Sequence, residues 1–176
     1  MELKEVMEDI ARDIADATKT LFQSMIMMEL KYNHVVLADE THLKTDVTSF
    51  VSFMGKYHGI VGIFCSKNFS LKVASSMLME DLTKITTEVI DAIGEITNMI
   101  AGNVKTKITT DYGEMDLSVP ITFIGGDTIT QAEEDEPVAS NSSILCVTKE
   151  PWLLTSFSSD KETFNVGLLL KESARQ

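Results

Sequence analysis

Three polar residues at helical spacing are the ones in this chain whose types and positions could do chemistry together. Asp91, Glu95 and Asn98 stand four and three residues apart in a segment whose apolar residues recur with a helical period. At 100° per residue, the three side chains fall within about 60° of one another on the helix surface. A carboxylate and an amide so placed can reach one point on a partner's surface. The spacing therefore makes Glu95 and Asn98 candidates for a site.

The same spacing also has an ordinary structural interpretation, because exposed helix faces are rich in glutamate and asparagine. One detail favours function: asparagine forms helices poorly, and Gly102 and Asn103 follow about one turn later in a helix that is otherwise well formed. Departures from local preference concentrate at functional sites. From the residues alone, both interpretations stay open.

The sequence lacks the motifs of the common hydrolases and metal enzymes. Its three histidines form no HExxH pattern, and it has no GxSxG nucleophile elbow. Gly125 and Gly126 are not followed by the lysine of a phosphate-binding loop. Cys65 and Cys146 are far apart in the chain, so we expect buried, reduced thiols. We expect neither a metal nor a cofactor of the chain's own.

The candidate residues lie on a long helix predicted for residues 82–107, whose stripe of isoleucine and valine should hold Glu95 and Asn98 on the solvent face. Two other helices are predicted at 3–30 and 69–79. Strands are predicted at 47–53 and 60–65 (a hairpin), at 115–124 (with Pro120 inside), and at 143–149, 151–158 and 163–170. Helices packed on an antiparallel or mixed sheet give an α+β fold class, in one domain spanning 1–176. The acidic stretch 127–141 is predicted to be a flexible surface loop.

A faint internal repetition links the first helix to the long one. Asp16, Thr20 and Gln23 have the same spacing as Asp91, Glu95 and Asn98. Two short matches in a polar stripe also arise by chance, so an internal pseudo-repeat and a coincidence both remain open.

The net charge and the hydropathy of the chain limit the kinds of partner that it can bind. The formal net charge of −12 disfavours nucleic acid and anionic membrane surfaces. No apolar run approaches the ~18 residues of a membrane span, and the N-terminus is acidic and amphipathic. We expect a cytoplasmic protein without a membrane segment.

The segment from Asp91 to Asn103 resembles the signature of the CheC/CheX/FliY family of chemotaxis phosphatases. That signature has Asp or Ser, then Glu, then Asn at the spacing of Asp91, Glu95 and Asn98, followed by a proline. Pro120 follows Asn98 after 21 residues, one fewer than is usual in the family. CheC-type members carry two copies of the motif and CheX-type members one. Thr20 and Gln23 stand where a first copy would have Glu and Asn, so the chain is most similar to CheX.

The resemblance implies a function. The family removes the phosphoryl group from the aspartyl phosphate of CheY, so the implied partner is a phosphorylated CheY-like receiver domain. Asn98 would position the attacking water and Glu95 would pair with the receiver's active-site lysine, while Asp91 would have no chemical role. The Mg²⁺ that neutralises the phosphate charge would be held by the receiver. CheX relatives are homodimers, which implies a homodimer here.

Two other functions remain alternatives. One is a non-enzymatic docking module of the same fold that binds a receiver domain or a flagellar switch component without turning it over. The other is a stand-alone dimeric structural domain, for which the acidic surface is the only support. Retention of both Glu95 and Asn98 argues against the docking module, because an adaptor does not need that pair.

Overall fold

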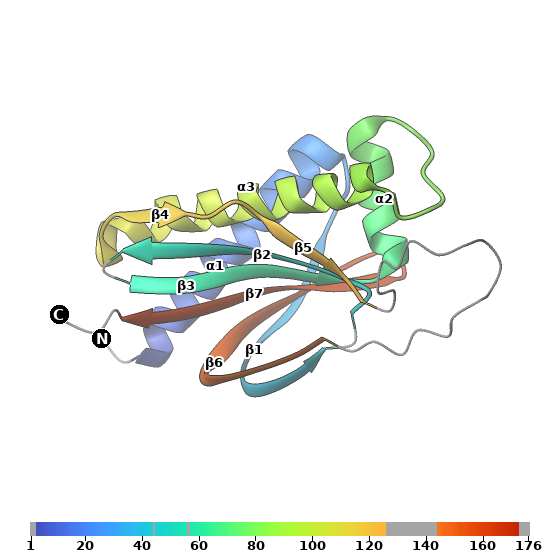
Figure 1. The fold of residues 1–176 in the computed structure, drawn as a ribbon. Helices are drawn as coiled ribbons and strands as arrows, with labels where there is room; N and C mark the ends of the chain where they lie inside the picture. Colours follow the sequence, from blue (N-terminus) through green and yellow to red (C-terminus); the bar gives the residue numbers. More distant parts are fainter. Residues whose placement is uncertain (1–2, 44, 56, 126–143, 173–176) are drawn as a thin grey trace.

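An antiparallel sheet of seven strands carries the helices on one of its faces (Figure 1). The computed structural model describes residues 3–43, 45–55, 57–125 and 144–172. The strands are β1 (Lys31–Leu43), β2 (Val47–Gly55), β3 (Tyr57–Cys65), β4 (Met115–Leu117), β5 (Ile121–Ile124), β6 (Ile144–Ser159) and β7 (Glu162–Glu172). The helices are α1 (Leu3–Leu21), the π-helical turn η1 (Phe22–Ile26), α2 (Lys67–Leu78) and α3 (Thr87–Tyr112). The predicted α+β class is confirmed.

The sheet joins strands from both ends of the chain. Its order is β1-β6-β7-β3-β2, and the far edge of β2 pairs with the two short strands β4 and β5. The predicted hairpin is β2–β3, in which Val47 pairs with Cys65 and Met54 with His58. Alternate residues of β2 point to opposite faces, so Val47, Val51 and Phe53 are buried beneath the helices.

The main core lies between the helices and one face of the sheet. α1 contributes Ile10 and Ile14, and α3 contributes Ile93, Ile96 and Ile100. Each aliphatic side chain buried in this way stabilises the fold by about 1.5–3 kcal/mol. Four stacked phenylalanine rings extend the core toward α2. They belong to Phe22, Phe69, Phe157 and Phe164. Both long helices are thereby attached to the same sheet.

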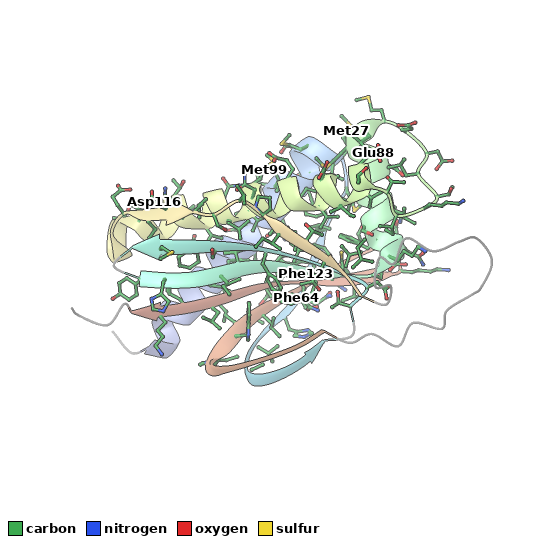
Figure 2. All side chains as sticks on the ribbon, viewed as in Figure 1. Met27, Phe64, Glu88, Met99, Asp116 and Phe123 are labelled. Atoms are coloured by element: carbon green, nitrogen blue, oxygen red, sulfur yellow. The ribbon has the colours of Figure 1, made fainter. Side chains whose placement is uncertain are left out.

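A smaller apolar cluster covers the opposite face, where two paired glycines make room for it. Gly62 on β3 lies across from Gly167 on β7. Rings from neighbouring strands fill the space above them, and Phe64 and Trp152 meet edge to face with centroids 5.8 Å apart. Figure 2 labels Phe64 on the side of the sheet away from α3. A Cβ on Gly167 would lie 2.8 Å from the Phe64 ring and 2.9 Å from that of Trp152. The cluster therefore requires glycine at this position.

The first helix ends earlier than the predicted 3–30. α1 changes into the π-helical turn at Phe22, and Met27 closes that turn in the left-handed conformation, with φ 54°. The Phe22 carbonyl accepts hydrogen bonds from the N–H groups of Met27 and Met28. The chain then enters β1, a strand that the pattern did not predict. Val36 and Leu37 are consecutive and both exposed in this edge strand, so the alternation that marks a strand is missing.

The long helix is shifted from the predicted 82–107 to Thr87–Tyr112. The N–H of Leu82 donates to Ser75 Oγ at 3.0 Å, which holds that residue in the α2–α3 loop. At the other end, Gly113 stops the helix in a conformation, φ 83°, that favours glycine.

Two predictions placed the breaks between strands wrongly. The strand at 115–124 is two strands, β4 and β5, separated at Ser118–Pro120, and the strands at 143–149 and 151–158 are one, β6. Pro151 lies within β6 where its pairing with β1 changes register, between the pairs Ala38–Trp152 and Glu40–Val147. A proline is tolerated at such an irregularity because it supplies no ladder hydrogen bond. The acidic loop predicted at 127–141 lies outside the described residues.

The glycine pair leads to a stability prediction. Gly167→Ala should lower the free energy of unfolding by about 1–3 kcal/mol, because its methyl group would push into the rings of Phe64 and Trp152. Gly102→Ala is the matched control. Nothing lies within 4 Å of a Cβ on this helical glycine, so alanine should raise stability by about 0.5–1 kcal/mol. Urea unfolding measures both, and equal stability of Gly167→Ala and the parent would contradict the packing described.

Candidate active site

α3 presents Glu95 to solvent because the opposite side of the helix is fixed in the core. Asp91 and Glu95 are both exposed, as predicted. Asn98 is partly buried, so it is less exposed than the predicted solvent-facing position. Asn98 lies one helical turn from Gly94, where a neighbouring segment approaches α3.

The segment between β4 and β5 lies against α3 one turn before Asn98. A Cβ built on Gly94 would be 3.5 Å from the Pro120 ring, an ordinary van der Waals contact, and at the same distance from Thr122 Oγ1. Thr122 Oγ1 donates to Ser49 Oγ at 2.9 Å and so ties the segment to β2. Gly94 and Asn98 are one helical turn apart and therefore share this side of α3. The flank that carries Asn98 is thus supported by the segment containing Pro120.

The side chains of Glu95 and Asn98 form no polar contacts within the described part of the chain. Neither the Glu95 carboxylate nor the Asn98 amide makes a hydrogen bond or ion pair with another described residue. By contrast, the neighbouring Thr97 is fully buried and its Oγ1 donates to the Ile93 carbonyl at 2.7 Å. The two candidate side chains therefore retain their donors and acceptors for a partner.

The N-terminus of α3 is neutralised by its own chain. A hydrogen bond from the Thr86 side chain, and a second from its own N–H, lower the pKa of Glu88. The Glu88 carboxylate is therefore charged at neutral pH and sits at the positive end of the helix dipole.

Cys65 is unsuited to act as a nucleophile. Burial, followed by the charge of Asp46, raises the pKa of its thiol, which therefore stays protonated at neutral pH. The side chain of Cys146 lies outside the described set. The expectation of a buried thiol is met for Cys65.

Thr20 and Gln23 do not repeat the geometry of Glu95 and Asn98. Both are exposed, but Thr20 is in the last turn of α1 and Gln23 is in the π-helical turn. The change of helix type between them alters the angle that a three-residue spacing produces.

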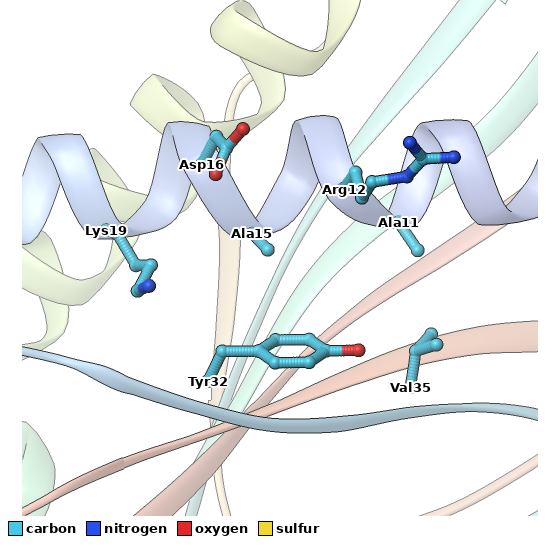
Figure 3. A pocket seen from close by; sticks show the side chains of 7 residues that line it. All are labelled: Ala11, Arg12, Ala15, Asp16, Lys19, Tyr32 and Val35. Atoms are coloured by element: carbon cyan, nitrogen blue, oxygen red, sulfur yellow. The ribbon is translucent and has the colours of Figure 1, made fainter.

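A groove of about 380 Å³ runs between α1 and β1 (Figure 3). Ala11 and Ala15 form its floor on α1, and Tyr32 and Val35 line it from β1. Asp16 is exposed and borders the groove, with its side chain on the side of α1 that points away from Tyr32 (Figure 3).

Two features are absent from the described residues. Among them, no three His, Cys, Asp or Glu side chains form a group able to hold a metal ion. No helix in the described ranges is both long and apolar enough to cross a bilayer.

Comparison with known proteins supports the family resemblance. The family model described as chemotaxis phosphatase CheX matches residues 47–142. No curated protein matches in sequence. Among solved structures, the chemotaxis protein CheX of Desulfovibrio desulfuricans is 23% identical with a TM-score of 0.77, over 93% of this chain and 99% of that one.

Two further structures share the fold. A CheC-like superfamily protein of a Shewanella species is 24% identical with a TM-score of 0.77, over 97% of this chain and 99% of that one. A CheX–CheY–BeF3–Mg²⁺ complex from Borrelia burgdorferi includes a chain 20% identical with a TM-score of 0.69, covering 92% of this chain and 97% of that one. The matched family segment contains α3 with Asp91, Glu95 and Asn98, and also Pro120. The chain therefore belongs to the CheX family of chemotaxis phosphatases.

Proposed function

We propose that this chain is a phosphatase that removes the phosphoryl group from the aspartyl phosphate of a CheY-like response regulator in chemotaxis signalling. The observation that carries the proposal is the pairing of Glu95 and Asn98 on α3, at the family's motif positions, with both side chains uncommitted. The Borrelia burgdorferi relative supports it, because that CheX is in a complex with CheY, BeF3 and Mg²⁺.

Asn98 is proposed to position the attacking water. Its amide can donate to or accept from a water placed in line with the phosphorus, and an amide has no proton to titrate. The water oxygen forms the new bond to phosphorus as the bond to the receiver's aspartate breaks, and the water protons remain with the phosphate and solvent. Phosphoryl transfer requires positioning and charge stabilisation more than covalent catalysis. The partial burial of Asn98 restricts its rotamers, which favours such positioning.

Glu95 is proposed to dock the receiver by pairing with its active-site lysine. Because Glu95 is exposed, the carboxylate is hydrated before docking and loses part of that hydration in the complex, where a charge-assisted hydrogen bond replaces it. Asp91, one turn earlier, is assigned to the rim of the docking surface without a chemical role.

The proposed site needs a metal ion from its partner, a shared location with that partner and a single folded domain. The Mg²⁺ belongs to the receiver, and the chain supplies no cofactor of its own. The receiver's cytoplasmic location implies the same location for this chain. Pairing of β1 with β6 supports a single domain over residues 1–176.

We also propose a homodimer joined through the open edge of β1. Within the described residues, β1 pairs only with β6, and its Val36 and Leu37 are 49% and 54% exposed. An exposed edge strand with apolar side chains is suited to pair with the same strand of a second copy.

Sedimentation velocity tests the dimer. The parent should sediment at twice the chain mass at micromolar concentration, and Leu37→Lys should shift it to the monomer, because lysine at an edge opposes strand pairing. Met54→Lys is the control, since Met54 is 70% exposed on β2, away from β1. A monomeric parent would exclude the proposed dimer.

Substrate choice tests the proposed activity. The protein should accelerate phosphate release from a phosphorylated, magnesium-loaded receiver and leave a phosphorylated phenol unchanged. The reason is that the proposed site contains no nucleophile, so the partner must supply part of it. Comparable turnover of the small ester would contradict the mechanism, and binding of the receiver without turnover would establish the docking module instead.

Single substitutions separate the roles of the two residues. Asn98→Ala should lower the maximal rate by roughly 10²–10³ with little change in half-saturation, since one positioned transition-state contact is lost. Glu95→Ala should raise the half-saturation concentration, because a charged docking contact is removed. Phosphate-release kinetics against receiver concentration give both quantities.

The chain offers a matched control for this experiment. Thr20→Ala combined with Gln23→Ala alters the equally spaced pair on the first helix and should leave the rate within about threefold of the parent, below the tenfold that ~1.4 kcal/mol represents. Far-UV spectra of all variants should match the parent. If Glu95→Ala and Asn98→Ala both behave like this control, the site is assigned to the wrong residues.

A further inference from the structure

The segment between β4 and β5 presents one apolar side chain beside the candidate site. Val119 is 77% exposed, although valine is an apolar residue. It lies between Ser118 and Pro120, in the segment that runs along α3 (Figure 1). Ile121 and Phe123, on the adjoining β5, are also exposed, at 55% and 49%. Exposure of an apolar residue needs no explanation by itself. The way this one is held distinguishes it.

Both neighbours of Val119 are fixed. The Ser118 N–H donates to the Ser52 carbonyl at 2.8 Å, and the Ser52 N–H donates to Ser118 Oγ at 2.9 Å. Ser118 Oγ in turn donates to the carbonyl of Val119 itself at 2.9 Å. On the other side, the Pro120 ring packs against α3 at Gly94.

The local chemistry makes Val119 rigid. A residue that precedes proline is restricted to extended conformations, and a β-branched side chain has few rotamers. The segment therefore displays an apolar group that loses little conformational entropy when a partner covers it, which is a property of preorganised binding residues.

Val119 lies within reach of an interface centred on the candidate pair. A specific protein–protein interface covers about 800 Å² on each partner, equivalent to a disc with a radius of about 16 Å. One helical turn from Asn98 to Gly94 covers about 6 Å, and a Cβ on Gly94 would be 3.5 Å from the Pro120 ring, which places their Cα atoms at most about 6.5 Å apart. Val119 adds about 3.8 Å, so its Cα is at most about 16 Å from that of Asn98. A partner centred on Asn98 therefore reaches the segment that carries Val119.

We propose that Val119 is a partner-contact residue that sets the affinity of this chain for its receiver, by packing on an apolar patch next to the receiver's phosphorylation site. The proposal rests on the proposed phosphatase function and goes beyond it by assigning an affinity determinant outside the Glu95–Asn98 pair. Polar motif residues match the groups common to all receivers. An apolar contact beside them distinguishes receivers by the shape of their surface.

The test compares two substitutions to threonine at exposed apolar positions. Val119→Thr keeps the branched shape and replaces a methyl group with a hydroxyl, so it should weaken binding of a beryllofluoride-activated, magnesium-loaded receiver by about three- to tenfold. Met54→Thr is the control, because Met54 is a 70% exposed apolar residue of β2 on the face of the sheet opposite the helices. It should leave the affinity per chain unchanged. Val119→Ala provides a second variant in case threonine disturbs the segment.

Two measurements keep this inference separable from the proposed function. Fluorescence anisotropy with a labelled receiver gives the dissociation constant without turnover, and phosphate release gives the maximal rate, which Val119→Thr should leave within about twofold. If the parent binds and turns over the receiver but Val119→Thr and Val119→Ala bind as tightly as the parent, the inference is overturned and the proposed function stands. If the parent neither binds nor dephosphorylates the receiver, both are overturned.

Discussion

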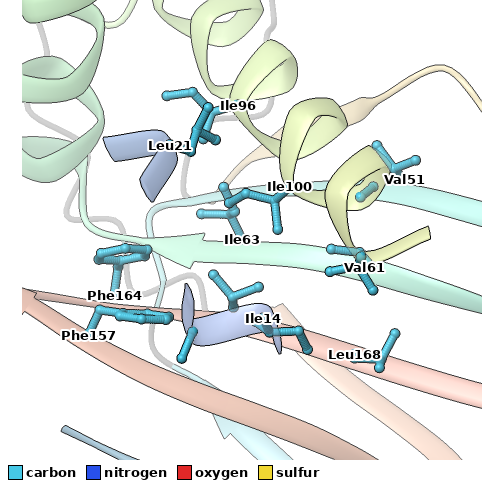
Figure 4. Packing of buried hydrophobic residues seen from close by; sticks show 14 of the residues in the cluster. Ile14, Leu21, Val51, Val61, Ile63, Ile96, Ile100, Phe157, Phe164 and Leu168 are labelled. Atoms are coloured by element: carbon cyan, nitrogen blue, oxygen red, sulfur yellow. The ribbon is translucent and has the colours of Figure 1, made fainter. Parts of the chain in front are cut away.

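The rotation of α3 about its own axis is the constraint on which the rest of the site depends. Ile96 points into the core toward Leu21, and Ile100 points toward Ile63 of β3 (Figure 4). Turning the helix by one residue's angle, 100°, would lift these side chains into solvent and bring polar ones into the core, where an unpaired carboxylate costs several kcal/mol. The hydrophobic contact with the sheet therefore sets the direction of Glu95, although Glu95 touches none of it.

Because the same periodicity defines the core and the polar face, the sequence predicts this part of the molecule well. The stripe of isoleucine and valine predicted the helix, its buried side and the exposure of Glu95. The start of the helix could not be predicted because it depends on a residue of another helix. Ser75, on α2, accepts the hydrogen bond that keeps Leu82 out of the helix. A capping partner that is supplied by tertiary structure leaves no local signal.

Other features depend on pairings that no local pattern contains. β1 is an edge strand in which the consecutive residues Val36 and Leu37 are both exposed, so it lacks alternation, and only its pairing with β6 identifies it. Pro120 suggested a strand edge or bulge from its missing N–H, but its contact with Gly94 follows from how the β4–β5 segment crosses α3. Sequence reasoning found the residues of the candidate site and missed the segment that supports one of them.

The two long helices differ in how well they fix the relative direction of two side chains. α3 keeps α-helical geometry from Glu95 through Asn98, whereas α1 changes to a π-helical turn after Thr20, before the equally spaced Gln23 is reached. In an unbroken helix, the angle between two side chains is maintained by every backbone hydrogen bond around them, so an exposed pair needs no contacts of its own to stay aligned. Uncommitted side chains and a fixed relative direction are then compatible. That combination suits a surface whose chemistry is completed by groups from a partner, because the pair enters the complex already oriented and without internal bonds to break.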